Sequence, residues 1–344
     1  MKHIRAACLA AATILAACSG GDRTPVVVYS PHGRDLLELL EKTYEAAHPE
    51  IDVRWLDMGS QKVLERIRSE AANPQADVWF GGPSTIFAQG AKAGLLAPYR
   101  PGWADAVPAA SRHPEGLYHG VFRSLPVLVY NTNLVPETEA PTDWASLLEP
   151  RFTGKVLMRD PLESGTMRTV FGMVLARSIA DTGSPDSGFA WLARLDAQTK
   201  EYVPDPILML TKLVRGEGTV TVWDLTDILF QRDKKAPLAY RFPNSGTPVI
   251  DDAIGLVAQA PHPEAARAFI EWVGSPEALR LAAEKAYRVP ARSDLPASEL
   301  PPWAQEVLAA LVPATYDATL VTEHGPEWMA RWDRTVRGRG SVAP

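Results

Sequence analysis

The sequence has 344 residues, a formal net charge of −6 and an isoelectric point near 5.7. A chain of this length exceeds the usual size of one hydrophobic core, so we expect two lobes. Apolar residues make up 46% and charged residues 22% of the chain, which is typical of a globular protein. The acidic balance argues against nucleic-acid binding, since nucleic-acid-binding domains usually present a basic face.

The first residues have the pattern of an export signal. Basic residues precede an apolar run over 6–17, which is too short to span a bilayer. The run ends in Leu-Ala-Ala-Cys and resembles a bacterial lipobox, in which Cys18 becomes the lipidated first residue; a plain signal peptide is the alternative. Since Cys8 falls in the removed segment, the mature chain forms no internal disulfide. We expect residues 1–18 to be a lipoprotein signal peptide and residues 19–24 a spacer. The mature protein would then be lipid-anchored to a membrane, in the periplasm or at the cell surface.

The first predicted lobe alternates strands and helices, as parallel sheets do. Its predicted elements are a strand over 26–29, a helix over 35–48, a strand over 51–56, a helix over 61–72 with Ser60 as N-cap, a strand over 76–80 and a short helix over 83–91. Ligands of such sheets bind beyond the carboxyl ends of the strands. Ser30, His32 and Ser84 occupy these ends, so they are candidate ligand-binding residues.

The second predicted lobe repeats this pattern. Its strands are predicted over 118–123, 125–130, 154–158, 201–203, 219–223 and 240–242, and its helices near 144–147 and over 170–179, 186–195, 206–215 and 224–231. A strand over 249–257 crosses back to the first lobe, and helices over 263–273, 276–286, 301–311 and 327–336 complete the chain. We therefore expect residues 25–122 and 250–344 to form lobe 1 and residues 123–249 to form lobe 2, with the ligand between them.

The turn over 160–169 joins an apolar strand to an apolar helix. Ser164 is a candidate N-cap, and Gly165 lets a ligand approach the backbone. A helix N-terminus attracts anions because its N–H groups are unpaired and it carries about half a positive charge. Thr166 and Arg168 add a hydroxyl and a cation to the first turn, which makes this segment a candidate anion site. The alternative is an ordinary strand-to-helix turn.

A second polar strand end follows the strand over 219–223 and reads Asp-Leu-Thr-Asp. Asp224, Thr226 and Asp227 are therefore candidate ligand-binding residues. The alternative for Asp224 is an N-cap, and Asp227 can simply favour the helix dipole. Arg288, which borders a proline-containing loop, is expected to be solvated.

Several short segments occur in a characteristic order along the mature chain. They are 26–30 (Val-Val-Val-Tyr-Ser), 76–80 (Ala-Asp-Val-Trp-Phe), 128–132 (Leu-Val-Tyr-Asn-Thr), Trp144 with 154–156 (Gly-Lys-Val), 160–161 (Asp-Pro), 164–166 (Ser-Gly-Thr) and 260–266 (Ala-Pro-His-Pro-Glu-Ala-Ala). With them the chain resembles the extracellular solute-binding proteins of ABC importers, in the branch that contains the ferric-ion-binding proteins. The resemblance implies a type II periplasmic-binding-protein fold, with a doubly wound, mainly parallel α/β sheet in each lobe. It also implies a transport role with an ABC permease and its ATPase as partners, and we expect a monomer.

The ligand that the resemblance implies depends on residues 224–227. Ferric-ion-binding members place a pair of adjacent tyrosines there, whereas this chain has none. The departure is similar to the branch that binds phosphorylated sugars, phosphonates or other small organic anions. In that interpretation the aspartates accept hydrogen bonds from ligand hydroxyls or an amine, and the anionic end is held by Ser30, Ser84, Ser164, Thr166 and Arg168. The alternative is a ferric site with carboxylate ligands, near which His32 could lie. We expect no cofactor and no resident metal.

An enzyme is a different class of interpretation. Glu163, Asp224 and Asp227 could supply paired carboxylates for a hydrolase. However, the sequence lacks both a Gly-x-Ser-x-Gly elbow and a His-Glu-x-x-His metal motif. A passive adhesin is the third class, but it would not need two polar strand ends that converge on a cleft. We therefore expect a binding protein that is not an enzyme.

Overall fold

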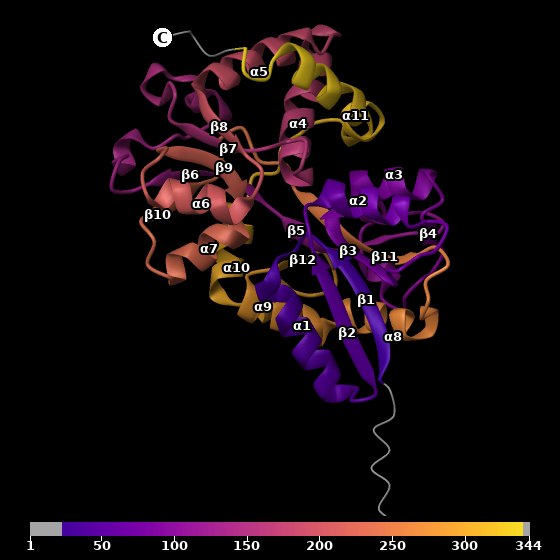
Figure 1. Ribbon diagram of the computed structural model, residues 1–344. Coiled ribbons are helices and arrows are strands. Elements are labelled where there is room, and N and C mark those ends of the chain that lie inside the picture. Colours follow the sequence, from indigo (N-terminus) through magenta and orange to yellow (C-terminus); the bar gives the residue numbers. More distant parts are fainter. Residues whose placement is uncertain (1–22, 340–344) are drawn as a thin grey trace, which may run out of the picture.

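The computed structural model describes residues 23–339, which form two lobes, each built around its own sheet (Figure 1). This arrangement confirms the predicted two-lobed α/β architecture. The predicted signal peptide and Cys18 lie outside the described residues. Among the helices over 23–339, none combines the length and apolarity needed to cross a membrane.

The sheet of the first lobe is mixed, with the order β12-β5-β11-β3-β1-β2 and with β4 paired to β11. Its strands are β1 (Thr24–Ser30), β2 (Ile51–Asp57), β3 (Val78–Pro83), β4 (Leu96–Ala97), β5 (His119–Ser124), β11 (Ile250–Val257) and β12 (Val289–Pro290). Strands β2, β1 and β3 are parallel, whereas β11 is antiparallel to both β3 and β5. The prediction of a mainly parallel sheet therefore holds only for the first three strands, because β11 returns from the other lobe and enters from the opposite direction.

Helices cover both faces of this sheet, since neighbouring side chains on a strand point to opposite faces. Val28 packs in one core with α1 (Arg34–Ala47), α8 (Pro263–Val273) and α9 (Pro276–Ala286). Tyr29 packs in the other core with α2 (Ser60–Ser69) and α3 (Ser84–Lys92). Gly59 occupies the N-cap position of α2, so the prediction of Ser60 as N-cap is wrong by one residue. Because α2 and α3 follow β2 and β3, their N-termini lie at the carboxyl edge of the sheet.

The sheet of the second lobe has the order β10-β6-β9-β7-β8. Its strands are β6 (Pro126–Asn131), β7 (Val156–Arg159), β8 (Thr199–Val203), β9 (Val220–Asp224) and β10 (Leu238–Arg241). Its helices are the 3₁₀ helix η4 (Trp144–Leu148), α4 (Gly165–Thr182), α5 (Asp186–Gln198), α6 (Pro206–Val214) and α7 (Leu225–Asp233). This sheet is also mixed, since β9-β7-β8 are parallel and β10-β6-β9 are antiparallel. The parallel strands β7 and β9 end at one edge, where α4 and α7 begin.

Within residues 23–339 the chain crosses between the lobes three times, and the first two crossings lie side by side. The first joins β5 to β6, and the second joins β10 to β11. Thr247 Oγ1, on the second crossing, donates to the carbonyl of Pro126 on the first. Ser124 Oγ on β5 donates to Asp252 Oδ2 on β11 at 2.5 Å. These two hydrogen bonds hold the crossings against each other.

The last two helices, α10 (Pro302–Ala310) and α11 (Ala318–Thr335), do not share one lobe. α10 contributes Ala304 to the core of the first lobe and Val307 to that of the second, whereas Trp328 and Trp332 of α11 lie only in the core of the second. The boundary that assigned all of 250–344 to lobe 1 is therefore wrong for α11, which packs on α4 and also contacts α3. The helix begins at Ala318 and not at residue 327, because it continues through Pro326, a residue that usually marks a helix boundary.

Candidate ligand-binding cleft

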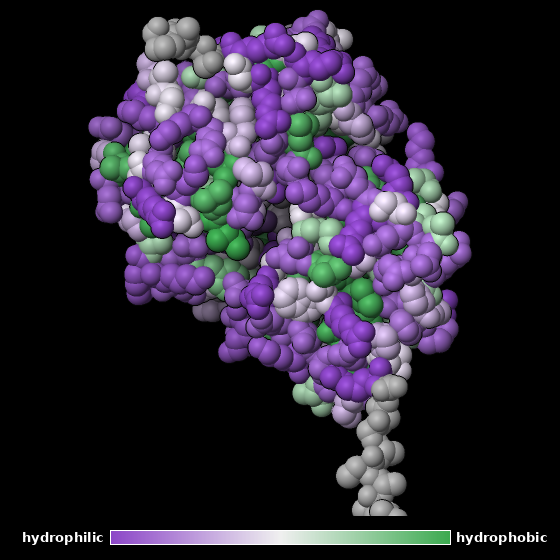
Figure 2. Space-filling view, viewed as in Figure 1, coloured by the Kyte–Doolittle hydropathy of each residue, from purple (hydrophilic) through white to green (hydrophobic). Residues whose placement is uncertain are grey.

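The lobes meet where three helices begin, next to a hollow that the space-filling view shows between them (Figure 2). Gly165, the first residue of α4, faces Pro83 before α3 and Ser60 at the start of α2. A Cβ atom added at Gly165 would lie 2.6 Å from Pro83 Cδ and 3.1 Å from Ser60 Oγ. The N-termini of α2, α3 and α4 therefore converge across the cleft. Each contributes unpaired N–H groups and partial positive charge.

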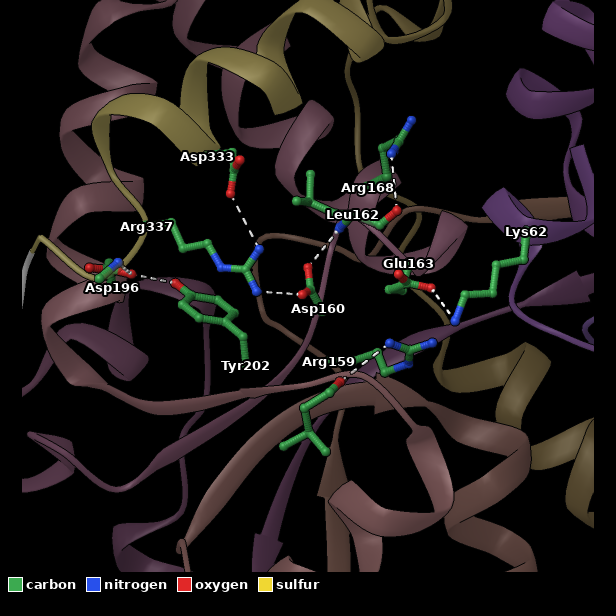
Figure 3. Close-up of polar contacts among 12 residues, drawn as sticks. Lys62, Arg159, Asp160, Leu162, Glu163, Arg168, Asp196, Tyr202, Asp333 and Arg337 are labelled. Atoms are coloured by element: carbon green, nitrogen blue, oxygen red, sulfur yellow. Dashed lines mark hydrogen bonds and ion pairs between the residues drawn. The ribbon is translucent and has the colours of Figure 1, made fainter. Parts of the chain in front are cut away.

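A second close approach between the lobes lies beside the first. A Cβ atom at Gly59 of the first lobe would lie 2.8 Å from the carbonyl oxygen of Glu163 in the second lobe. Lys62 on α2 forms an ion pair with Glu163 at 3.1 Å (Figure 3). The turn before α4 therefore contacts the start of α2 both through this close backbone approach and through the Lys62–Glu163 ion pair.

Two buried polar side chains at this junction have unused hydrogen-bond donors. Arg159, at the end of β7, is 4% exposed, and its Nη1 donates to the Val203 carbonyl at 3.3 Å. Its Nε and the Nε2 of Gln61 on α2 have no hydrogen-bond partner among the described residues. Arg159 Nη2 lies 3.5 Å from the position of a Cβ atom on Gly59, so the guanidinium reaches the junction between the lobes. Burial lowers the pKa of Arg159, and an anion at this junction would restore the stability of its charge.

The predicted anion turn is only partly arranged as expected. Ser164 is the N-cap of α4, as predicted, and its Oγ accepts from the Met167 N–H at 3.2 Å. Thr166 is half-buried in the first turn of the helix. Arg168 differs, because its guanidinium turns back toward the Pro161 and Leu162 carbonyls at 3.5 and 3.4 Å (Figure 3). Burial lowers the pKa of Arg168 to about 10, so it remains a cation at neutral pH. These contacts fit a role in stabilising the turn better than a role in binding the ligand.

The polar end of β9 also has contacts within the protein. Asp224 caps α7 by accepting from the Thr226 N–H at 3.1 Å, which is the alternative that the sequence offered. Thr226 Oγ1 donates to the Tyr287 carbonyl at 2.9 Å, and this bond links the two lobes. Asp227 Oδ2 accepts from Trp223 Nε1 at 2.6 Å. Burial, followed by the charge of Asp224, raises the pKa of Asp227 to about 6.

Asp252 and Arg288 add charges that were not among the predicted site residues. Asp252 is 5% exposed, and burial raises its pKa to about 7. The bond from Ser124 opposes this rise, and the charge of Asp224 adds to it.

Arg288 is 7% exposed and not solvated as expected, since the pairing of β12 with β5 holds it inside. Its Nη2 donates to the His32 carbonyl at 2.7 Å, while its Nε has no partner within residues 23–339. The positive charge of Arg288 partly offsets the rise in the pKa values of Asp227 and Asp252 that burial causes. No local sequence pattern signals these two residues, because their burial comes from long-range strand pairing.

The three candidates on the first lobe lie at the carboxyl edge of its sheet. Ser30 is fully buried, and its Oγ accepts from the His32 N–H at 3.1 Å. The His32 ring lies 4.6 Å from Phe80 and 5.8 Å from Phe122, and burial holds its pKa well below the usual value, so it is neutral. Its Nε2 has no partner in the described chain, whereas Ser84 begins α3 and is half-buried. Over residues 23–339, no group of three or more His, Cys, Asp or Glu side chains is placed to hold a metal ion.

Two cavities lie elsewhere, on the second lobe. One, of about 280 Å³, is lined by residues of η4, α4 and α5, and the other, of about 600 Å³, by residues of β6, α7 and β10. All of their lining residues belong to the second lobe. Neither combines convergent helix N-termini with buried cations, so the cleft is the better candidate site.

Comparison with known proteins identifies the family. Residues 40–310 match the family model described as bacterial extracellular solute-binding protein. The chain is 29% identical over 281 residues to the probable ABC transporter periplasmic-binding protein y4fP of Sinorhizobium fredii, covering 81% of this chain and 78% of the relative. It is 28% identical over 288 residues to a putative 2-aminoethylphosphonate-binding periplasmic protein of Salmonella typhimurium, covering 82% and 78%.

Solved structures with the same fold include binders of different solutes. The periplasmic binding protein AfuA of Actinobacillus pleuropneumoniae, solved with fructose-6-phosphate, gives a TM-score of 0.80 at 23% identity, covering 91% of this chain and 98% of AfuA. Iron-bound HitA of Pseudomonas aeruginosa gives 0.75 at 20% identity, covering 89% and 98%. Such low identities show the fold alone, and they confirm the predicted type II periplasmic-binding-protein fold.

The relatives are periplasmic or extracellular proteins that deliver a solute to a permease and its ATPase, and proteins of this kind are generally not enzymes. The family model spans most of the chain, from within α1 to the end of α10. The chain is therefore a substrate-binding protein of an ABC importer and belongs to the family of bacterial extracellular solute-binding proteins.

Proposed function

We propose that the cleft captures a small organic anion with a phosphate or phosphonate group, such as a phosphorylated sugar. The observation that carries this proposal is the convergence of the N-termini of α2, α3 and α4 beside Arg159, whose buried Nε has no partner among the described residues. Helix N-termini and a planar guanidinium are the groups that recognise phosphate oxygens in proteins. Relatives named for 2-aminoethylphosphonate binding and a neighbour solved with fructose-6-phosphate support the same solute class.

The acidic side of the cleft would recognise the rest of the solute. Asp227 and Asp252 each lie near Asp224 and near the cation Arg288. Carboxyl groups in this setting accept hydrogen bonds from hydroxyls or from an amine. Since these groups come from both lobes and the crossing, a solute that touches all of them would favour the closed state.

Titration calorimetry with fructose 6-phosphate, 2-aminoethylphosphonate and ferric citrate tests the solute class. The parent should bind at least one of the organophosphorus probes. Arg159→Ala should weaken that binding about ten- to a hundredfold, the cost of one charge-assisted contact of about 1.5–3 kcal/mol. Arg168→Ala should have a smaller effect, because its guanidinium contacts backbone carbonyls. Arg194→Ala, an exposed arginine of the same lobe, is the matched control.

Ferric binding is the competing outcome. Tight binding of ferric citrate by the parent, abolished by Asp227→Ala and unaffected by Arg159→Ala, would replace the anion site with a carboxylate iron site. Turnover of either organophosphorus probe during the titration would instead contradict our proposal that the cleft performs no catalytic step.

We further propose that Cys18 carries a lipid anchor. Cys18→Ser should move the protein from the membrane fraction to the soluble fraction. Calorimetry should show unchanged affinity, because residues 19–23 separate Cys18 from β1, which begins at Thr24, one residue before the predicted end of the spacer. Membrane retention of the variant equal to that of the parent would contradict the anchor.

A further inference from the structure

We propose that Arg337, outside the cleft in the segment that follows α11, positions the turn before α4 and leaves Arg159 free for the anion. This inference rests on the proposed function, and it concerns a residue that does not touch the solute. Arg337 Nη2 donates to Asp160 Oδ2 at 2.6 Å, and Nη1 lies 3.3 Å from Asp333 Oδ1 (Figure 3). Its guanidinium also lies 5.7 Å from the ring centres of both Tyr202 and Trp332. The next residue, Gly338, donates its N–H to Asp196 at 3.0 Å, so this segment is docked on the lobe at two points.

Asp160 organises the turn that delivers Ser164 and Gly165 to the cleft. Its Oδ1 accepts from the Leu162 N–H at 2.9 Å. Its carbonyl accepts from the N–H groups of Glu163 and Ser164 at 3.1 and 3.0 Å. A residue that fixes the Asp160 carboxylate therefore fixes the position at which α4 begins.

The same contact has an electrostatic effect. The negative charge of Asp160 partly offsets the lowering of the pKa values of Arg159 and Arg168 by burial. It is 6% exposed, so water screens its charge poorly. Without Arg337, the Asp160 carboxylate would be left to Arg159 and Arg168, and at Arg159 it would add to the charge of Glu163 in competing with the anion. With Arg337 in place, Asp160 is neutralised from the side away from the cleft (Figure 3).

Arg337→Gln tests this inference, because glutamine keeps part of the stem that packs near Tyr202 and removes the charge. We expect its affinity for fructose 6-phosphate or 2-aminoethylphosphonate, whichever the parent binds, to fall about tenfold, as expected for residues that share one network. Arg337→Lys keeps the charge and should restore most of the affinity. Arg331→Ala is the matched control, since Arg331 lies near the end of α11, shortly before Arg337, and pairs with Asp186 at 2.7 Å, away from the turn.

A double-mutant cycle with Asp160→Asn separates positioning from general stability. Asparagine keeps an oxygen for the Leu162 N–H but carries no charge to compensate. In that background Arg337→Gln should change the affinity by less than about twofold. Hydrogen exchange over 160–166 without solute should be faster in Arg337→Gln than in the parent, which provides a readout independent of binding.

The outcomes distinguish the two proposals. If the parent binds neither organophosphorus probe, the proposed function fails and this inference fails with it. If the parent binds but Arg337→Gln binds equally well, or loses the same affinity in both backgrounds, only the role of Arg337 is overturned.

Discussion

Asp252 links the stability of the fold to pH. Its carboxyl group is buried beside Ser124, and burial raises its pKa from the ordinary value of 3.8 to about 7. Between these two values the folded protein keeps a proton that the unfolded chain has released. The folded state therefore binds more protons in this window, and the free energy of unfolding falls as the pH rises through it. Asp227, with a pKa of about 6, contributes in the same direction.

Asp252→Asn should flatten this pH dependence. Asparagine keeps an acceptor for Ser124 and carries no charge, so the variant should melt above the parent at about pH 8 and close to it at about pH 5. Thermal unfolding followed by circular dichroism across this range gives the comparison. Asp294→Asn is the control, because the nearby Arg292 lowers the pKa of Asp294 and its titration falls below the window. A difference in melting temperature between Asp252→Asn and the parent that is the same at about pH 5 and about pH 8 would contradict the assignment, whereas groups such as His32, whose lowered pKa acts in the opposite direction, affect both proteins equally.

Residue-scale prediction from the sequence succeeded where the cause was local. The N-cap roles of Ser164 and, as the alternative, of Asp224 could both be predicted from the sequence, because a cap depends on residues two or three positions away. Arg288 was misassigned because its burial depends on β12 pairing with β5, where Val289 lies opposite Arg123. The back-turned guanidinium of Arg168 likewise depends on the path of the preceding turn, which residue types alone do not specify.

The start of α4 is the element on which closure depends most directly. Gly165 has no Cβ atom, and this absence allows α4 to approach Pro83 and Ser60 on the other lobe. We expect Gly165→Ala to leave each lobe folded but to oppose their contact. Overpacking of about 1–3 kcal/mol would weaken solute binding about 5- to 150-fold.

Small-angle scattering and calorimetry check this expectation. With saturating solute the parent should become more compact, whereas Gly165→Ala should need more solute or remain extended. Gly325→Ala is the matched control, since this helical glycine of α11 has open space where a Cβ atom would lie. Alanine there should slightly stabilise the protein, as expected for a helix interior. Equal affinity of Gly165→Ala and the parent would show that closure does not use this contact.

At the scale of the whole molecule, the sequence predicted two lobes and most of their strands and helices. Alternating apolar periodicity identifies elements, and the chain order of strands and helices indicates which elements share a sheet. It does not state which sheet a late helix will cover. α11 has an apolar face that fits a core, but only the three-dimensional packing against Gly172 and α4 assigns it to the second lobe. The antiparallel entry of β11 was missed for the same reason.

The placement of α11 also decides how the molecule would carry tension. The described chain starts with β1 in the first lobe and finishes just after α11 in the second, at opposite ends of the molecule (Figure 1). A force pulling on those two ends must pass through one sheet, across the cleft and into the other sheet. The cleft contacts described above include one ion pair and two close approaches, whereas each sheet is held by ladders of backbone hydrogen bonds, so we expect the cleft contacts to separate first. If α11 covered the first lobe, the same force would act within that lobe and would not act on the contacts across the cleft. With α11 on the second lobe, a solute bound in the cleft would add contacts that resist the separation of the lobes by this force.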